Sequence, residues 1–154
     1  MNKQEFVYTT YIKTTPEKIW SAITTPEFCR QYWGNVNISD WKQGSTWQHV
    51  TVDGTETVVI AGNVLESVPP KRLVLTWAAP DNTADPSTHS RVSFDIEMAG
   101  DMVRLNVTHS GLEAGSLMAT RVANGWPRVL CSMKSLLETG TALDTWAGFA
   151  HSCS

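Results

Sequence analysis

Apolar and polar residues alternate along six segments between residues 35 and 111, and this period of two predicts the strands of an antiparallel sheet. A seventh strand is predicted at 6–13, where β-branched and aromatic residues are concentrated. Gly100-Asp101 provides a tight turn between two strands, and Pro69-Pro70 separates two others. Where the alternation is clearest, one face is apolar and the other carries charged residues. The six segments are 37–41, 45–52, 57–68, 72–79, 90–98 and 102–110.

Two short helices are predicted between the first strand and the second. Thr15 is suited to the N-cap position and Pro16 to the first helical position, and Thr25 and Pro26 repeat this start signal. Gly34 is suited to end the second helix, because glycine readily adopts the left-handed conformation found there. The predicted order is therefore one strand, two short helices and six strands.

A single long helix is predicted after the sheet, from apolar residues at near-helical spacing. This stripe consists of Val122, Trp126, Leu130, Met133 and Leu137. Pro127 is expected either to kink the helix or to mark its beginning, and Gly140 is expected to end it. A sheet with one apolar face buries that face by curling around such a helix, which leaves a core or a cavity between them. These elements predict one α+β domain over residues 1–140 and an unassigned tail at 141–154, which contains Trp146 and Phe149.

Composition and charge narrow the range of functions. The 154 residues carry a net charge of -3 with acidic and basic residues interspersed, so the chain lacks a basic surface for nucleic acid or anionic membranes. No segment has the apolar length of a signal peptide or a membrane span. Cys29, Cys131 and Cys153 are widely spaced and form no Cys-x-x-Cys pair, which favours reduced thiols in a cytoplasmic protein. Neither nucleic acid nor a membrane is expected as a partner.

Short motifs occur in a fixed order along residues 5–140. They are Thr15-Pro16-Glu17-Lys18-Ile19-Trp20, Thr25-Pro26-Glu27, Tyr32-Trp33-Gly34, Gly62 through Glu66, Pro69-Pro70-Lys71-Arg72-Leu73, Thr76-Trp77, Thr108-His109-Ser110-Gly111, and Gly125-Trp126 with Leu130 and Leu136. The ordered set resembles the START-like, birch-pollen-allergen-like helix-grip superfamily, in the branch similar to the activator of heat-shock-protein ATPase. The resemblance implies a seven-stranded antiparallel sheet that grips the C-terminal helix, with a pocket between them. It leaves activity open, because the superfamily includes lipid and hormone binders, polyketide cyclases and co-chaperone modules.

Aromatic residues suggest where a ligand would bind. Seven tryptophans are many for this length, and aromatic side chains around a hollow commonly line ligand pockets. The alternative for each residue is ordinary core packing, and the two interpretations overlap, because a pocket residue is a core residue with one side left unfilled. The candidate pocket consists of Trp33, Trp47, His49, Trp77, Phe94, His109, Trp126, Leu130 and Met133.

Three residues are candidates for acid–base chemistry. Strand parity places His109 on the apolar face, where we favour a structural histidine bonded to backbone at a strand end. His49 shares one strand face with Trp47, and Glu66 is favoured at an exposed or rim position. The histidines form no His-x-x-x-His pair, and the chain has no phosphate-binding loop or nucleophile elbow. We therefore assign no catalytic residue and expect neither a metal nor a cofactor.

Three functions remain after these exclusions. The first is a binder of a small hydrophobic or amphipathic molecule. The second is an enzyme of cyclase or hydrolase type acting on a hydrophobic substrate, with His49, His109 and Glu66 as acid–base groups. The third, a co-chaperone or stress-related interaction module, rests on the resemblance alone. We favour them in that order, and a homodimer is the default expectation for a small cytoplasmic domain.

Overall fold

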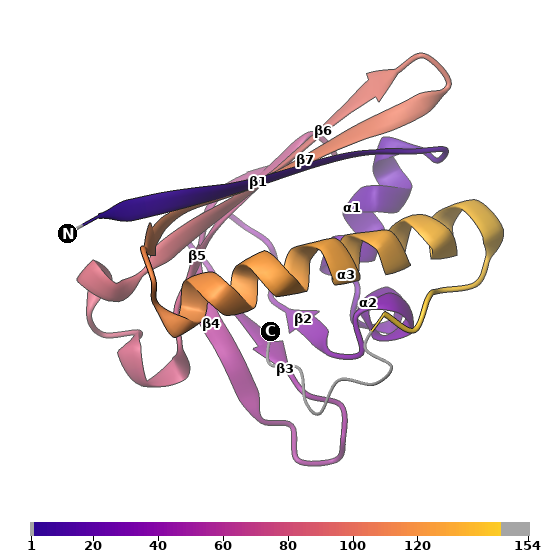
Figure 1. The fold of residues 1–154 in the computed structure, drawn as a ribbon. Coiled ribbons are helices and arrows are strands. Elements are labelled where there is room, and N and C mark those ends of the chain that lie inside the picture. Colours follow the sequence, from indigo (N-terminus) through magenta and orange to yellow (C-terminus); the bar gives the residue numbers. More distant parts are fainter. Residues whose placement is uncertain (1, 146–154) are drawn as a thin grey trace.

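A computed structural model describes residues 2–145, and its strands form one seven-stranded sheet (Figure 1). All neighbouring strands are antiparallel, in the order β1-β7-β6-β5-β4-β3-β2. Each predicted strand is present. The bounds are β1 (Lys3–Ile12), β2 (Val36–Ile38), β3 (Thr46–Val50), β4 (Val58–Val68), β5 (Arg72–Trp77), β6 (Ser90–Ala99) and β7 (Met102–Glu113).

The second strand is shorter than its sequence pattern predicts. β2 ends at Ile38 and does not reach Trp41. Trp41 has a φ of 61°, a left-handed backbone conformation that cannot continue a strand. Its indole Nε1 donates a hydrogen bond to the Thr24 carbonyl at 2.9 Å. This residue therefore leaves the sheet and anchors the loop after β2 to the helical region.

The described residues form three α-helices, α1 (Pro16–Thr24), α2 (Pro26–Tyr32) and α3 (Leu117–Thr139). Two short 3-10 helices, Pro80–Asn82 and Pro86–Thr88, lie between β5 and β6. The predicted N-cap of α1 is confirmed, since the Thr15 hydroxyl accepts a hydrogen bond from the Lys18 amide at 3.2 Å. Helix α3 is capped by Ser116, whose hydroxyl accepts from the Ala119 amide at 3.1 Å. Pro127 lies inside this helix, so the alternative that it marks the beginning is wrong.

Helix α3 lies along one face of the sheet, and α1 and α2 lie near its C-terminal half (Figure 1). Helix α3 contacts β1, β7 and α2, while α1 contacts β2 and β6. The inner face of the sheet and the facing side of α3 form the main hydrophobic core, which includes Leu105, Val107 and Leu130. The predicted helix-grip arrangement, a seven-stranded antiparallel sheet around a long C-terminal helix, is therefore confirmed.

An irregularity in β4 determines where Glu66 lies. The pairing register with β5 shifts between Val64 and Glu66, so strict alternation does not continue through this point. Val64 is buried, whereas Glu66 is exposed and its carboxylate bonds Arg72 Nε at 3.2 Å. The expected exposed position of Glu66 is confirmed.

The beginning of the predicted tail folds back onto α3. The Ser132 hydroxyl donates to the Leu143 carbonyl at 2.8 Å, and the Thr145 hydroxyl donates to the Arg128 carbonyl at 3.0 Å. Trp146 and Phe149 of that tail lie outside the described residues. Within residues 2–145, no helix is both long enough and apolar enough to span a bilayer.

Candidate functional site

A cluster of aromatic rings fills the middle of the space between the sheet and α3. Its central member is Trp126 on α3, whose ring centroid lies 5.6 Å from Trp33, 5.5 Å from Trp77 and 5.7 Å from Phe94. Trp47 on β3 extends the cluster, at 5.4 Å from Trp77. Trp33 is the most exposed of these side chains, at 6%. The fold thus brings residues of β3, β5, β6 and α3, together with the C-cap residue of α2, to one interior site.

The aromatic rings leave only a small cavity. Its volume is about 10 Å³, which is about the space that one water molecule needs. Of the nine residues in the candidate pocket, Trp33, Trp77 and Trp126 line this cavity. The other six are buried around it without lining it; they are Trp47, His49, Phe94, His109, Leu130 and Met133.

Helix α3 supplies three lining residues that were not predicted. Val122, Gly125 and Val129 line the cavity together with Trp126. They share one face of the helix because residues three and four apart lie side by side. Val122 belongs to the apolar stripe noted in the sequence, but that stripe does not indicate which of its members border empty space.

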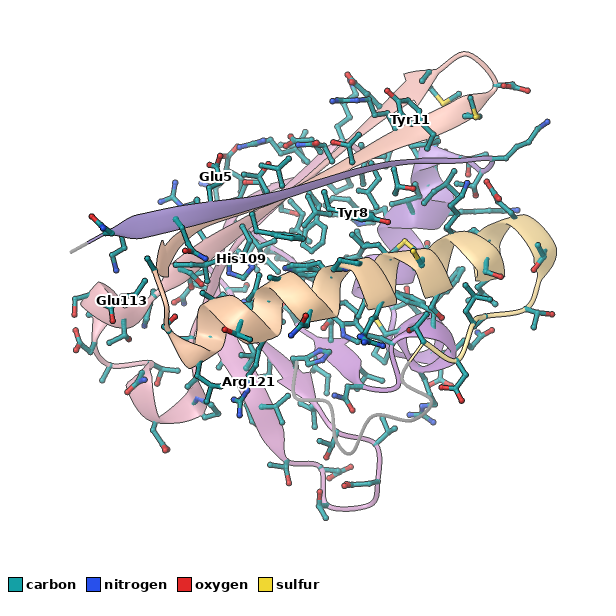
Figure 2. All side chains as sticks on the ribbon, viewed as in Figure 1. Glu5, Tyr8, Tyr11, His109, Glu113 and Arg121 are labelled. Carbon is teal, nitrogen blue, oxygen red and sulfur yellow. The ribbon has the colours of Figure 1, made fainter. Side chains whose placement is uncertain are left out.

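His109 of β7 lies between the sheet and α3 (Figure 2), and hydrogen bonds to β6 and α3 occupy both of its ring nitrogens. Trp126 Nε1 donates to His109 Nδ1 at 3.1 Å, so the ring proton resides on Nε2, which donates to the Ser90 hydroxyl at 2.7 Å. The Ser90 hydroxyl in turn donates to the Trp77 carbonyl at 3.3 Å. Burial lowers the pKa of His109 to about 3, which keeps the ring neutral. These bonds support a structural role for His109. The expected partner was the backbone, whereas the ring bonds the side chains of Trp126 and Ser90.

His49 is bonded through one ring nitrogen only. Its Nδ1 lies 2.7 Å from Asn37 Oδ1, and Asn37 Nδ2 donates to the Ile23 carbonyl at 2.9 Å. The second bond orients the amide so that its oxygen faces the ring, and His49 Nδ1 therefore carries the proton. Burial lowers the pKa of His49 to about 3, so the ring is neutral and its Nε2 presents a lone pair.

Three buried polar atoms around the aromatic cluster have no hydrogen-bond partner among the described residues. They are His49 Nε2 and the indole Nε1 atoms of Trp33 and Trp77. A buried polar group without a partner costs about 1–3 kcal/mol, and such groups are rare in native structures. All three belong to residues that the sequence placed in the candidate pocket. This concentration of unpaired atoms in the aromatic cluster that surrounds a small apolar cavity is the feature most suggestive of a ligand site.

The three candidate acid–base groups do not meet. Glu66 lies on the exposed surface with Arg72, and His109 has both ring nitrogens bonded. Of these three, only His49 has a buried acid–base atom without a partner in the described part of the chain. Across residues 2–145, no group of three His, Cys, Asp or Glu side chains is placed to hold a metal ion.

The sheet, the long helix and the interior site between them define a protein of the helix-grip class, the SRPBCC superfamily. Residues 13–138 match the family described as Activator of Hsp90 ATPase homolog 1-like protein, and the chain belongs to this family. A search of curated proteins found no match.

Solved structures share this fold at low sequence identity. The Aha1 dimer from Colwellia psychrerythraea has a TM-score of 0.73 and 24% identity, covering 89% of this chain and 98% of its own. PFC0360w, an HSP90 activator from Plasmodium falciparum, has a TM-score of 0.71 and 22% identity, covering 86% and 95%. CalU16 from Micromonospora echinospora has a TM-score of 0.65 and 21% identity, covering 83% and 72%.

Proposed function

We propose that this protein binds a small, largely apolar molecule between the sheet and α3, with the ligand packed against Trp77 and Trp126. The observation that carries the proposal is the apolar cavity lined by Trp33 and Trp77, whose indole N–H groups have no acceptor among residues 2–145. A ligand with an acceptor atom would satisfy such a donor. Membership of the family adds support, because helix-grip proteins often bind hydrophobic ligands.

A ligand larger than one water molecule requires a side chain to move, and Trp33 is the best candidate. It lies directly after α2, is followed by Gly34 with a φ of 90°, and is the cavity-lining tryptophan with the greatest exposure. Exposing an indole ring of 150–250 Å² costs about 4–6 kcal/mol at about 25 cal/mol per Å². Water would then accept a hydrogen bond from the indole N–H. This removes the cost of the unpaired donor and offsets about 1–3 kcal/mol of the cost of exposing the ring. A ligand of bicyclic size in the vacated space would restore most of the remaining apolar burial.

The test compares two tryptophan truncations. We expect Trp33→Ala to bind indole more tightly than the wild-type chain does, because the variant has the space already open. Trp41→Ala is the matched control, since Trp41 packs at the edge of the core without lining the cavity. Isothermal titration calorimetry measures both affinities. The proposal fails if neither the wild-type chain nor Trp33→Ala binds indole or naphthalene derivatives at their solubility limits.

A second candidate function is regulation of a chaperone ATPase, and the family match favours it. The test is the ATPase rate of purified Hsp90 with and without the chain. Trp33→Ala serves as the control, because opening an interior cavity leaves the outer surface unchanged. A rate increase that persists in this variant would support a chaperone role independent of the interior site.

We also propose a cytoplasmic location and a homodimer. Free thiols at Cys29 and Cys131 suit a reducing compartment. The dimer finds support in the similarity to the Aha1 dimer and in the position of β1 at the edge of the sheet. Light scattering at several concentrations tests the oligomeric state, and a monomer mass throughout would contradict it.

A further inference from the structure

His49 is buried, and among residues 2–145 only its Nδ1 atom has a hydrogen-bond partner. The neighbouring strand fixes its state, because Asn37 on β2 pairs directly with His49 on β3 in the sheet register. The Asn37 amide is itself anchored to the Ile23 carbonyl, so its oxygen accepts the proton of His49 Nδ1. His49 Nε2 is therefore a preoriented acceptor without a donor among residues 2–145.

Trp33 packs against the His49 ring. The two ring centroids are 4.6 Å apart, with the ring planes tilted by 47°. If Trp33 moves away from the interior, as the proposed function requires, the His49 ring becomes part of the wall of the enlarged site. A molecule that takes the place of the indole ring then lies against His49. This contact adds polar recognition to an otherwise apolar site.

We propose that the ligand of this site is a neutral aromatic or alicyclic molecule bearing a hydroxyl group, which donates its proton to His49 Nε2. This inference rests on the proposed function. A carbonyl or ether oxygen carries no proton and leaves the acceptor unpaired, whereas a hydroxyl donates to it and can still accept from an indole N–H. Among the described residues, the buried polar side chains are all uncharged, so an ionised ligand would have no partner of opposite charge. The buried polar side chains are Asn37, His49, Ser90, His109 and Ser132.

A matched pair of bicyclic ligands tests the hydroxyl directly. 2-Naphthol donates a proton, while 2-methoxynaphthalene has the same ring system and an oxygen that only accepts. Calorimetry should give a dissociation constant about tenfold lower for 2-naphthol, which corresponds to ~1.4 kcal/mol. In His49→Phe this preference should disappear. Trp41→Phe is the matched control, because Trp41 packs at the edge of the core without lining the cavity and the variant leaves His49 intact; it should retain the preference.

A measurement on the wild-type chain avoids any dependence on how the variants fold. The ¹⁵N NMR signal of His49 Nε2 should shift when 2-naphthol is added and stay in place with 2-methoxynaphthalene. If both ligands bind equally well, or if the signal is unmoved at saturating 2-naphthol, the hydroxyl inference is overturned while the proposed function stands. If neither ligand binds the wild-type chain or Trp33→Ala, the proposed function fails and this inference fails with it.

Discussion

Lowering the pH from 7.5 to 5 should destabilise this protein through His49 and His109. Burial lowers the pKa of each to about 3 in the folded chain, whereas an unfolded histidine titrates near 6.5. Between these values the unfolded state binds more protons than the folded state. The free energy of unfolding therefore falls as the pH falls below about 6.5. The stability contributed by the neutral rings is fully present above that pH.

The size of this loss of stability follows from the difference between the histidine pKa in the folded chain and that in the unfolded chain. At pH 5 an unfolded histidine lies about 1.5 units below its pKa, which at 1.36 kcal/mol per unit gives about 2 kcal/mol for each ring. His49 and His109 are both fully buried, and together they should lower the free energy of unfolding by about 4 kcal/mol. This is a large share of the 5–15 kcal/mol typical of small domains. Carboxylates with lowered pKa, such as Glu138, act at lower pH and contribute little in this window.

Urea denaturation followed by tryptophan fluorescence measures this effect at pH 7.5, 6.5, 5.5 and 5. His49→Gln and His109→Gln should each be less stable than the wild-type chain at pH 7.5, but each should lose only about 2 kcal/mol on acidification. A wild-type loss below about 1 kcal/mol, or a loss that neither substitution reduces, would show that the rings are not buried in the neutral form. The reasoning about both tautomers would then be wrong.

Three further substitutions test the packing around the site. Gly62→Ala should destabilise the fold by more than about 2 kcal/mol in urea melts. The new methyl group would lie 2.0 Å from the Thr76 carbonyl oxygen on β5. A variant as stable as the wild-type chain would contradict this spacing between β4 and β5. Ser116→Ala removes the N-cap of α3 and should cost about 1 kcal/mol, visible as a lower Tm; an unchanged Tm would show that the cap contributes nothing. Trp126→Phe leaves His109 Nδ1 without its donor and should cost about 1–3 kcal/mol in urea melts. A loss below about 0.5 kcal/mol would contradict that bond.

The strands and helices of this fold can be predicted from the sequence, because most of them have a strong local pattern of apolar residues or of capping residues. Alternation over β6 and β7 identifies both strands and their buried face, and Thr15-Pro16 identifies the start of α1. The beginning of α3 is harder to predict, because its first turn is exposed at Leu117 and lies ahead of the apolar stripe, which starts at Val122. Ser116 was a readable cap signal for this start.

The candidate site is harder to predict from the sequence than the fold, because it depends on contacts between segments that are distant in the sequence. Strand parity places His109 on the apolar face and His49 on the same face as Trp47. It does not reveal that Trp126 and Ser90 bond both nitrogens of His109, whereas His49 Nε2 has no partner among residues 2–145. Cavity size is equally hidden, since it depends on how several large rings pack together. The interior residues were therefore predictable, whereas the small volume of the cavity was not.

The central claim is that a small apolar molecule enters the space between the sheet and α3. Isotope-filtered NMR on the ¹³C-labelled chain with unlabelled 2-methoxynaphthalene tests this claim without relying on the hydroxyl. The account predicts contacts from ligand protons to the methyl groups of Val122 and Val129, and none to Val7, which is exposed on β1. Contacts confined to surface methyl groups, or no contacts at ligand saturation, would contradict it.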